Sequence, residues 1–400
     1  LNNTDAAATD SGYWYNQNPT DTQFGVGSDS GTNGTGYTYV AYLFADNSSE
    51  DADDQMIKCG SYTGNGSATG PVVNLGWEPQ FLMIKGTGSS FWWIYDTMRG
   101  LVVGGADSEL SPNHSGAESS LSNATAIDIL ANGFKLTTTS AEYNGSGTDY
   151  IYMAIRAPMM KKPTAATDVF KPHTQASGSA WSVGFPTDLW IGKERNRVYG
   201  GFFSDRLRGG TKYIKSHSTA VEATDGGGIT VFDLQDSFSQ GASSQSQINY
   251  NFKRAKGFFD VMAYEGNYSA NPQMLHNLGV APEMLIARSR DAVGQWYIKH
   301  TGMAANREIY FNSNASSIGS SWTTTNTYWQ YQSAQYPYDS HIAYLFASLA
   351  GVSKVGSYTG NGSNQTISCG FSAGSRFILI KRTDATGDWY FWDSLRGIVA

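Results

Sequence analysis

The string GSYTGNGS occurs twice in this chain, at Gly60–Ser67 and again at Gly356–Ser363. Asn-Gly flanked by residues such as Tyr and Thr is typical of a β-hairpin turn, so each copy predicts a strand that runs into a tight turn. An identical recurrence at such a distance also indicates that the chain is built from repeated units.

The surroundings of this string repeat as well. A glycine followed by an apolar run that ends at or near a basic residue occurs at Gly76–Lys85, Gly184–Lys193, Gly279–Arg288 and Gly370–Lys381. An aromatic strand leading into Arg-Gly follows at Trp92–Gly100, Phe202–Gly209 and Trp389–Gly397, whereas the third copy departs from this pattern at Trp296–Gly302. Units close on alternating aromatic segments at Tyr37–Phe44, Tyr150–Ile155, Asn249–Phe252 and His341–Phe346, a period of two that predicts half-buried strands.

The spacing of these signals sets the domain organisation. A period of roughly 100 residues is too long for a solenoid, so each copy predicts a separately cored domain. We divide the chain into an N-terminal segment that closes a preceding module (1–50), a first module (51–162), a second module (163–256), a third module (257–350) and a C-terminal segment that opens a further module (351–400).

Composition predicts the fold class. The 400 residues are 40% hydrophobic and 14% aromatic but only 15% charged, with 45 glycines, which favours strands and tight turns over helices. We expect an all-β chain of tandem antiparallel β-sandwich modules, of jelly-roll or lectin-like type, with a small barrel as the alternative. The segment Glu118–Leu130 predicts no more than a turn or two of helix.

Charge and cysteine content exclude several classes of protein. A net charge of −7 without a long basic cluster disfavours nucleic acid as a partner. The longest apolar run, Tyr37–Ala45, is too short to span a membrane as a helix, and the polar start has no signal-peptide core, so we expect no membrane association. Cys59 and Cys369 are too few for a disulfide framework and are expected to be unbonded thiols.

The repeated motifs resemble modules that occur in tandem in virion proteins of marine tailed phages. The resemblance covers nearly the whole chain and implies concanavalin-like sandwiches in tail or tail-fibre proteins. The second module departs from it, with Phe170–Thr174 in place of the Tyr-Thr-Gly-Asn-Gly hairpin, and the third lacks Asp-x-x-Arg-Gly. A ligand site common to all modules is therefore not implied.

The Asp-x-x-Arg-Gly element is the strongest polar candidate. It places a carboxylate and a guanidinium together at Asp96 and Arg99, Asp205 and Arg208, and Asp393 and Arg396. Such a pair can bind a sugar hydroxyl or a carboxylate, but recurrence at one position of the repeat favours a structural ion pair at a strand end. We predict charged atoms within about 4 Å of each other in these pairs.

Aromatic side chains are the second candidate, since their faces stack on sugar rings. The residues that could bind a glycan, together with Arg99 and Arg396, are Trp92, Trp93, Tyr95, Trp389, Tyr390 and Trp392. Alternation along a strand lets at most half of them face solvent.

The sequence predicts no catalytic residue, cofactor or metal. The six histidines lie at unrelated module positions, and the acidic run Glu50–Asp54 lacks the pattern of a calcium loop. The glycines Gly226–Gly228 have no following Lys-Ser/Thr for a phosphate cradle, and no nucleophile or carboxylate pair stands out.

These observations and the resemblance together lead to an expected function. We expect a structural virion protein of a tailed phage, made in the host cytoplasm, that serves in a tail fibre or other appendage and binds the host surface, for instance its glycans, by multivalent contact. Its partners would be other virion proteins and copies of itself, with a trimer implied by the resemblance. The alternatives are a glycan-degrading depolymerase and a cellular surface adhesin.

The two end segments hold incomplete modules, so we expect the chain to be part of a longer polypeptide, with complementation between chains into a head-to-tail filament as the alternative. A native mass near 43.3 kDa would contradict the longer polypeptide.

Overall fold

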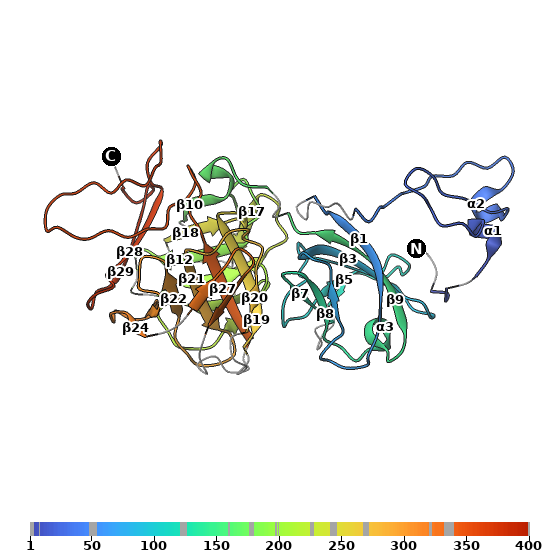
Figure 1. Ribbon diagram of the computed structural model, residues 1–400, viewed down its shortest axis with the longest axis horizontal. Coiled ribbons are helices and arrows are strands. Elements are labelled where there is room, and N and C mark those ends of the chain that lie inside the picture. Colours follow the sequence, from blue (N-terminus) through green and yellow to red (C-terminus); the bar gives the residue numbers. More distant parts are fainter. Residues whose placement is uncertain are drawn as a thin grey trace.

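The computed structural model of the protein describes most of the chain, and all structural statements below concern the described residues. These are residues 4–7, 9–47, 54–120, 126–158, 161–175, 180–196, 198, 200–224, 228–240, 246–266, 272–319, 322–331 and 340–398. The structure is nearly all β, as predicted, and its antiparallel sheets pair into sandwiches (Figure 1). Residues 50–53 and 225–227, which carry most of the acidic run and most of the glycine run, lie outside the described part.

The first module has a four-stranded sheet and a three-stranded sheet. The larger sheet has the order β1 (Ile57–Thr63), β9 (Asp149–Arg156), β3 (Pro79–Gly86) and β4 (Trp92–Asp96). The smaller has the order β2 (Val72–Asn74), β8 (Gly133–Leu136) and β7 (Ile127–Leu130). Strands β5 (Ser108–Glu109) and β6 (Ser119–Ser120) pair beside β4 through an isolated bridge, and the short helix α3 (Ala141–Asn144) precedes β9.

The second module repeats this order. Its six-stranded sheet runs β10 (Phe170–Gln175), β18 (Gln247–Phe252), β12 (Leu189–Glu194), β13 (Phe202–Asp205), β14 (Lys212–Lys215) and β15 (Ala223–Thr224). Its three-stranded sheet runs β11 (Ala180–Ser182), β17 (Ser237–Gln240) and β16 (Ile229–Val231), and the 3-10 turn η1 (Ala166–Asp168) precedes β10.

The third module has the same order again. Its larger sheet runs β19 (Phe259–Glu265), β27 (Ser340–Phe346), β21 (Met284–Ser289), β22 (Tyr297–His300), β23 (Arg307–Tyr310) and β24 (Ile318–Gly319). The smaller runs β20 (Met274–Leu275), β26 (Tyr328–Tyr331) and β25 (Trp322–Thr324). Strands that occupy the same place in this order are called equivalent below.

One glycine position of the repeat is explained by the backbone conformation that it requires. Gly76, Gly184, Gly279 and Gly370 begin the apolar runs, and their φ angles are 84°, 89°, 73° and 73°. A side chain is disfavoured in this left-handed region, so a glycine at this place lets the backbone turn into β3, β12, β21 and β28 (Phe377–Lys381).

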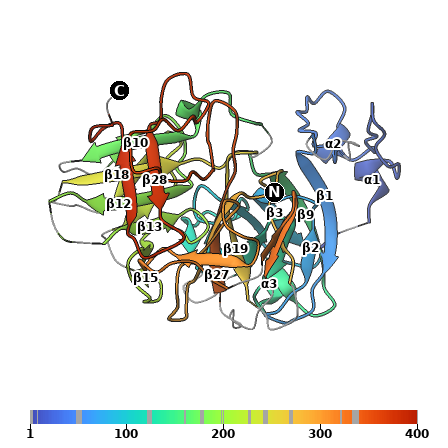
Figure 2. The ribbon, with the colours of Figure 1, turned by 60° about the vertical axis from the view of Figure 1, so that its left-hand side comes forward.

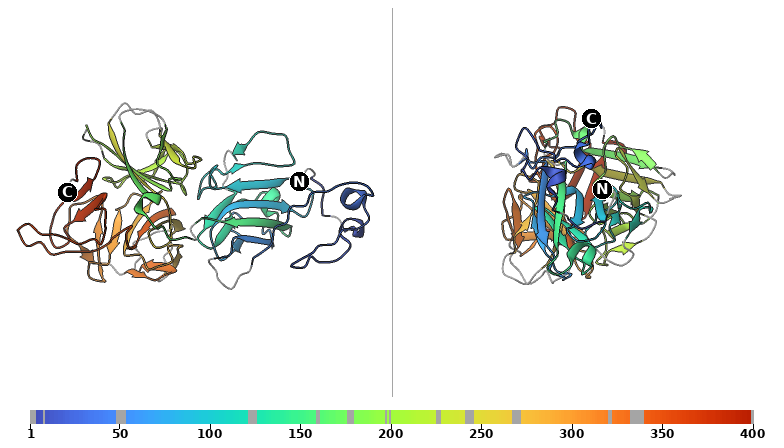
Figure 3. Two further views of the ribbon diagram at one scale, coloured as in Figure 1. Left: turned by 90° about the horizontal axis from the view of Figure 1, so that it is seen from above. Right: turned by 90° about the vertical axis from the view of Figure 1, so that its right-hand side faces the viewer.

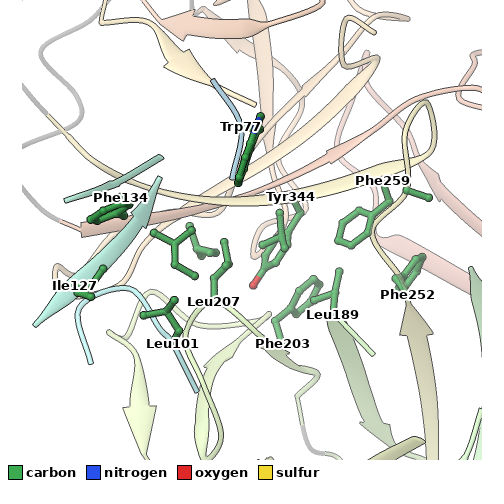
Figure 4. Packing of buried hydrophobic residues seen from close by; sticks show 14 of the residues in the cluster. Trp77, Leu101, Ile127, Phe134, Leu189, Phe203, Leu207, Phe252, Phe259 and Tyr344 are labelled. Atoms are coloured by element: carbon green, nitrogen blue, oxygen red, sulfur yellow. The ribbon is translucent and has the colours of Figure 1, made fainter. Parts of the chain in front are cut away.

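The apolar faces of the larger sheets join into one continuous core. Figure 4 shows Trp77 and Ile127 of the first module, Leu189 and Phe203 of the second, and Tyr344 of the third in a single cluster. The second and third modules also have cores of their own between their two sheets, centred on the buried Trp190 and Trp329. Buried side chains of all three modules are therefore in contact with one another.

The end segments are simpler. The C-terminal segment forms a hairpin of β28 and β29 (Trp389–Asp393), which lies against β10 and β18 of the second module (Figure 2). The N-terminal segment contains two four-residue helices, α1 (Ser11–Trp14) and α2 (Ser30–Asn33), at the opposite end of the molecule from that hairpin (Figure 1).

The prediction of a strand at Tyr37–Phe44 was wrong for this structure. The segment has no strand pairing, and Tyr42 is 83% exposed. A strand forms only where a neighbour satisfies its backbone N–H and C=O groups, and none of the described strands pairs with this segment.

The Glu118–Leu130 segment contributes to β6 and β7 where it is described, without helix. None of the helices in the described residues is long and apolar enough to cross a membrane.

Candidate functional site

The three Asp-x-x-Arg-Gly elements have the same local geometry. In each pair the arginine Nε lies 2.5 Å from the aspartate Oδ2, at Asp96 and Arg99, Asp205 and Arg208, and Asp393 and Arg396. The other carboxylate oxygen accepts the backbone N–H of the arginine, three residues further on. The aspartate therefore caps the turn that ends the strand, and the predicted ion pairs form.

A tyrosine from another module completes two of these pairs. The Tyr344 hydroxyl on β27 donates to Asp205 Oδ2 at 2.7 Å and accepts from Arg208 Nη2 at 3.0 Å. The Tyr250 hydroxyl on β18 likewise donates to Asp393 Oδ2 and accepts from Arg396 Nη2, both at 2.9 Å. Each phenol thus joins a carboxylate and a guanidinium of a neighbouring unit (an "Asp–Arg–Tyr contact" below).

Electrostatics hold the Asp–Arg–Tyr contact in one protonation state. Burial raises the pKa of Tyr344 well above its ordinary value, and burial also raises that of Tyr250, so both phenols remain donors at neutral pH. Burial alone would raise the pKa of Glu222, but the adjacent Arg208 and Arg290 outweigh it and keep the pKa low. The second-module pair is therefore part of a charged network with every partner in place.

Burial decides which pairs could meet a ligand. The side chains of Asp205 and Arg208 are 0% exposed, so a sugar cannot reach them. Asp393 is equally buried, although 31% of the Arg396 side chain is exposed. Asp96 and Arg99 are 25% and 20% exposed, and Arg99 Nη1 also lies 3.1 Å from the Glu118 carboxylate.

The aromatic candidates divide by strand face. Tyr95 is fully buried and donates to Glu109, and the half-buried Trp93 donates from its indole to Glu142. The proposed ligand role of Tyr95 was therefore wrong, because its ring faces the interior of the first module. Trp92 is the first residue of β4 and is half-buried, and its backbone N–H donates to Asn113 Oδ1.

The C-terminal aromatics are more open. Trp389 is half-buried and its indole donates to the Tyr310 carbonyl at 2.9 Å. Tyr390 and Trp392 are 51% and 43% exposed, and their rings stack with centroids 5.5 Å apart. They are equivalent to Trp93 and Tyr95 in the first module, so they project from the face that a second sheet covers there.

One buried cluster of charged side chains could not be predicted from the repeated motifs, because its residues come from different modules. Arg254 donates to both oxygens of Glu78, at 2.5 and 2.6 Å, and lies 2.7 Å from Asp260. Asp188 accepts the backbone N–H of Arg254 at 2.7 Å. The cluster joins the first module to the end of the second module and the start of the third. The side chains of Arg254, Glu78 and Asp260 are 1–7% exposed and that of Asp188 is 12% exposed, so the cluster serves packing and not a substrate.

The remaining candidate sites have few groups that could bind a ligand or a metal ion. Among the described residues, no group of three or more His, Cys, Asp or Glu side chains could hold a metal ion. A shallow hollow in the N-terminal segment, lined by residues such as Ser11, Tyr15 and Asn33, contains no charged side chain. Cys59 and Cys369 are free thiols.

Asp107 provides a pH-dependent test of the first-module core. Burial raises its pKa to about 7, against three opposing backbone donors from Val102, Ala126 and Ile127. Because the folded pKa lies above the unfolded one, the folded state retains a proton that the unfolded state releases. We therefore expect this group to reduce stability as pH rises from about 4 to 7, as measured by urea midpoints, and carboxyl-carbon NMR to show its titration near pH 7. The Asp107→Asn variant should lose this part of the slope, and a carboxyl titration below pH 5 would contradict the assignment.

The fold and these contacts define an all-β protein of tandem sandwich modules whose polar motifs join the modules. The sequence profile of one family, described as a domain of unknown function (DUF7483), matches residues 1–158 and 254–399. The chain belongs to this family. No curated protein matches it.

Proposed function

We propose that the chain is a structural protein of a tailed-phage virion, in a tail fibre or similar appendage, that contacts the bacterial surface at many weak sites. One observation carries the proposal: the most elaborate polar motif of the repeat is used to fasten modules to one another. Asp205, Arg208 and Tyr344 are all buried at such a junction. A chain that uses its motifs in this way is suited to bear load and to space contacts along its length.

The arrangement of the modules supports the same proposal. The first module lies beside the second and third along the long axis, and the end segments extend the molecule further (Figure 3). Repeated modules in such a body present many copies of a weakly binding surface, which raises overall affinity through effective concentration. The resemblance of the motifs to tail-fibre modules is the reason for placing the chain in a virion.

We favour this role over a depolymerase because the acidic pair Glu78 and Asp260 is buried around Arg254, and the more exposed pair Asp96 and Glu118 is held by Arg99. Glycoside hydrolysis needs two carboxyl groups that face a bound sugar across an accessible cleft. Incubation of the purified chain with host polysaccharide should therefore release no reducing ends, and a catalytic release of such ends would favour the enzyme.

Location in the particle is tested by immunogold electron microscopy. Antibodies against the purified chain are applied to gradient-purified particles from an infected culture that carries the gene, and to uninfected cells as the control. We expect gold on the tail or its appendages. Label on the surface of uninfected cells, with none on particles, would support the adhesin and contradict the proposal.

A further inference from the structure

We propose that Asp96 and Arg99 form a docking site for the tyrosine-bearing closing strand of a further module of the second-module kind, carried by the same polypeptide. This contact would bring the first module and two further modules of the same polypeptide together into a closed group of three. The inference concerns assembly of the chain and does not depend on where the chain acts.

Successive units are joined by the same set of hydrogen bonds, in which a basic and a tryptophan side chain of one unit donate to backbone carbonyls of the unit before it. This set of contacts, together with the backbone hydrogen bonds beside it, is called the seam below. From the third module, Arg288 Nη2 donates to the Thr219 and Ala220 carbonyls of the second at 2.7 and 2.6 Å, and the Trp296 indole donates to the Lys215 carbonyl at 2.9 Å. From the C-terminal segment, the same roles fall to Lys381, which donates to the Asn314 and Ala315 carbonyls at 3.2 and 3.1 Å, and to Trp389, which donates to the Tyr310 carbonyl at 2.9 Å.

The backbone part of this seam also joins the N-terminal segment to the first module. Ser90 N–H donates to the Thr4 carbonyl at 3.0 Å and Ala7 N–H donates to the Thr87 carbonyl at 2.7 Å. The matching pairs elsewhere are Gly294 to Thr219 and Glu222 to Arg290, then Gly387 to Asn314 and Ser317 to Thr383.

Within the described residues, the first and second modules are joined differently. Val103 N–H donates to the Leu207 carbonyl at 2.8 Å, and Arg206 approaches the Thr97 carbonyl. The seam therefore joins the N-terminal segment to the first module and the second module to the third. Between the first and second modules, other contacts replace it.

The second module, third module and C-terminal segment close on one another. Two seams link them in order, and the Asp–Arg–Tyr contact between Tyr250 and the Asp393–Arg396 pair returns from the last unit to the first. Figure 3 shows the second and third modules side by side with the C-terminal hairpin next to them, while the first module occupies a separate level along the long axis. These three units thus form a layer with an approximate threefold arrangement inside one chain.

The repeat order places the first module at the position of the C-terminal segment. GSYTGNGS opens both, and each copy follows a segment of matching sequence, Val40–Phe44 in one case and Ile342–Phe346 in the other. The family profile matches the same two stretches, 1–158 and 254–399. Asp96 and Arg99 therefore correspond to Asp393 and Arg396, whose partner is Tyr250 of the second module.

The pattern of missing residues agrees with this order. Met83, Ile191 and Ile286 have the same position in the apolar runs of β3, β12 and β21. Their cross-strand partners are Met153 of β9, Tyr250 of β18 and Tyr344 of β27. Met153 therefore occupies the place of the two tyrosines. In a closed layer, a unit at the first module's position would present this residue to a unit of the third-module kind. The third module is the one without Asp-x-x-Arg-Gly, so acceptor and tyrosine are lost together.

The Asp96–Arg99 site already has the geometry of an acceptor. Arg99 Nη2 donates to the Ile94 carbonyl at 3.2 Å, as Arg208 donates to Phe203 at 2.8 Å and Arg396 to Phe391 at 3.1 Å. Glu118 lies on Arg99 as Glu222 lies on Arg208. Among the described residues no tyrosine hydroxyl bonds to it, and the pair is 20–25% exposed, whereas Asp205 and Arg208 are fully buried.

The test extends the chain by the units that the proposal requires. Residues 163–347 are fused before residue 46 in place of residues 1–45, so that a copy of the second and third modules precedes the first. We expect Asp96→Asn and Tyr250→Phe in the inserted copy each to lower the urea midpoint, and the double variant to lower it no further than the larger single change.

Two matched cycles accompany this one. Asp205→Asn with Tyr344→Phe in the unextended chain is the positive control and should also be non-additive. Asp96→Asn with the inserted copy of Tyr344→Phe should be additive, because that tyrosine has its acceptor in the inserted copy of Asp205. Additivity between Asp96 and the inserted Tyr250 would overturn the proposal.

Electron cryo-microscopy of the extended chain gives an independent reading. We expect the inserted modules at the level of the first module, related to it as the second and third modules are related to the C-terminal segment. Inserted modules elsewhere would overturn the proposal. So would association of the unextended chain that Asp96→Asn abolishes, because the occupant would then be a second copy.

Discussion

Replacement of Arg254 by Met should lower the free energy of unfolding by about 3–5 kcal/mol, because it leaves buried carboxylates without their counter-charge. Arg254 is bonded to Glu78 and Asp260, and their side chains are 7%, 6% and 1% exposed. Burial already raises the pKa of Glu78 despite the lowering effect of the guanidinium. Urea unfolding at pH 7 is the measurement.

The control is Arg382→Met. Its partner Asp384 lies 2.7 Å away, but the two side chains are 60% and 77% exposed, so removal of this pair should leave the urea midpoint unchanged. The loss in Arg254→Met should shrink as the pH is lowered toward 4, because protonation removes the unpaired negative charge. An Arg254→Met midpoint equal to that of Arg382→Met would contradict the assigned role.

Replacement of Trp296 by Ala should lower the free energy of unfolding by about 3–5 kcal/mol, the usual cost of removing a buried aromatic side chain. Trp296 is 0% exposed, and its ring centroid lies 4.8 Å from that of Phe203 in the second module. It also lies 6.2 Å from that of Phe311 and 6.5 Å from that of Tyr344. Its indole donates across the seam to Lys215, so both apolar packing and a hydrogen bond are lost.

Two variants separate these effects. Trp296→Phe keeps most of the apolar volume and removes the indole donor, so it should cost much less than the alanine variant. Trp392→Ala removes an indole that is 43% exposed and should have a small effect. If Trp296→Ala and Trp392→Ala gave equal urea midpoints, the seam would not stabilise the chain as we describe.

Both predictions concern contacts between modules, which bear on how the chain works as an assembly. The Asp–Arg–Tyr contact and the seam make the orientation of one module depend on the next, because each contact needs a donor and an acceptor at fixed places. Such contacts restrict the movement of one module relative to the next. This property suits the proposed role in a virion appendage.

Local patterns in the sequence were sufficient for the fold class and for the ion pairs. Period-two strands, Asn-Gly turns and the repeated glycine before β3, β12, β21 and β28 all depend on residues that are neighbours in the chain. The Asp-x-x-Arg-Gly pair is equally local, since the turn itself brings Asp205 to Arg208. Such features can be recognised without knowledge of how modules pack.

Only the tertiary structure decided what these features contact. The partner of Asp393 is Tyr250 and the partner of Arg254 is Glu78, and in each case the two residues belong to different units of the chain. Tyr95 is buried whereas the equivalent Trp392 is 43% exposed, and Tyr37–Phe44 forms no strand although its pattern predicts one. Strand pairing, burial and the choice of a charged partner depend on which surface lies opposite, and that surface is brought there by packing between modules and not by the residues adjacent in sequence.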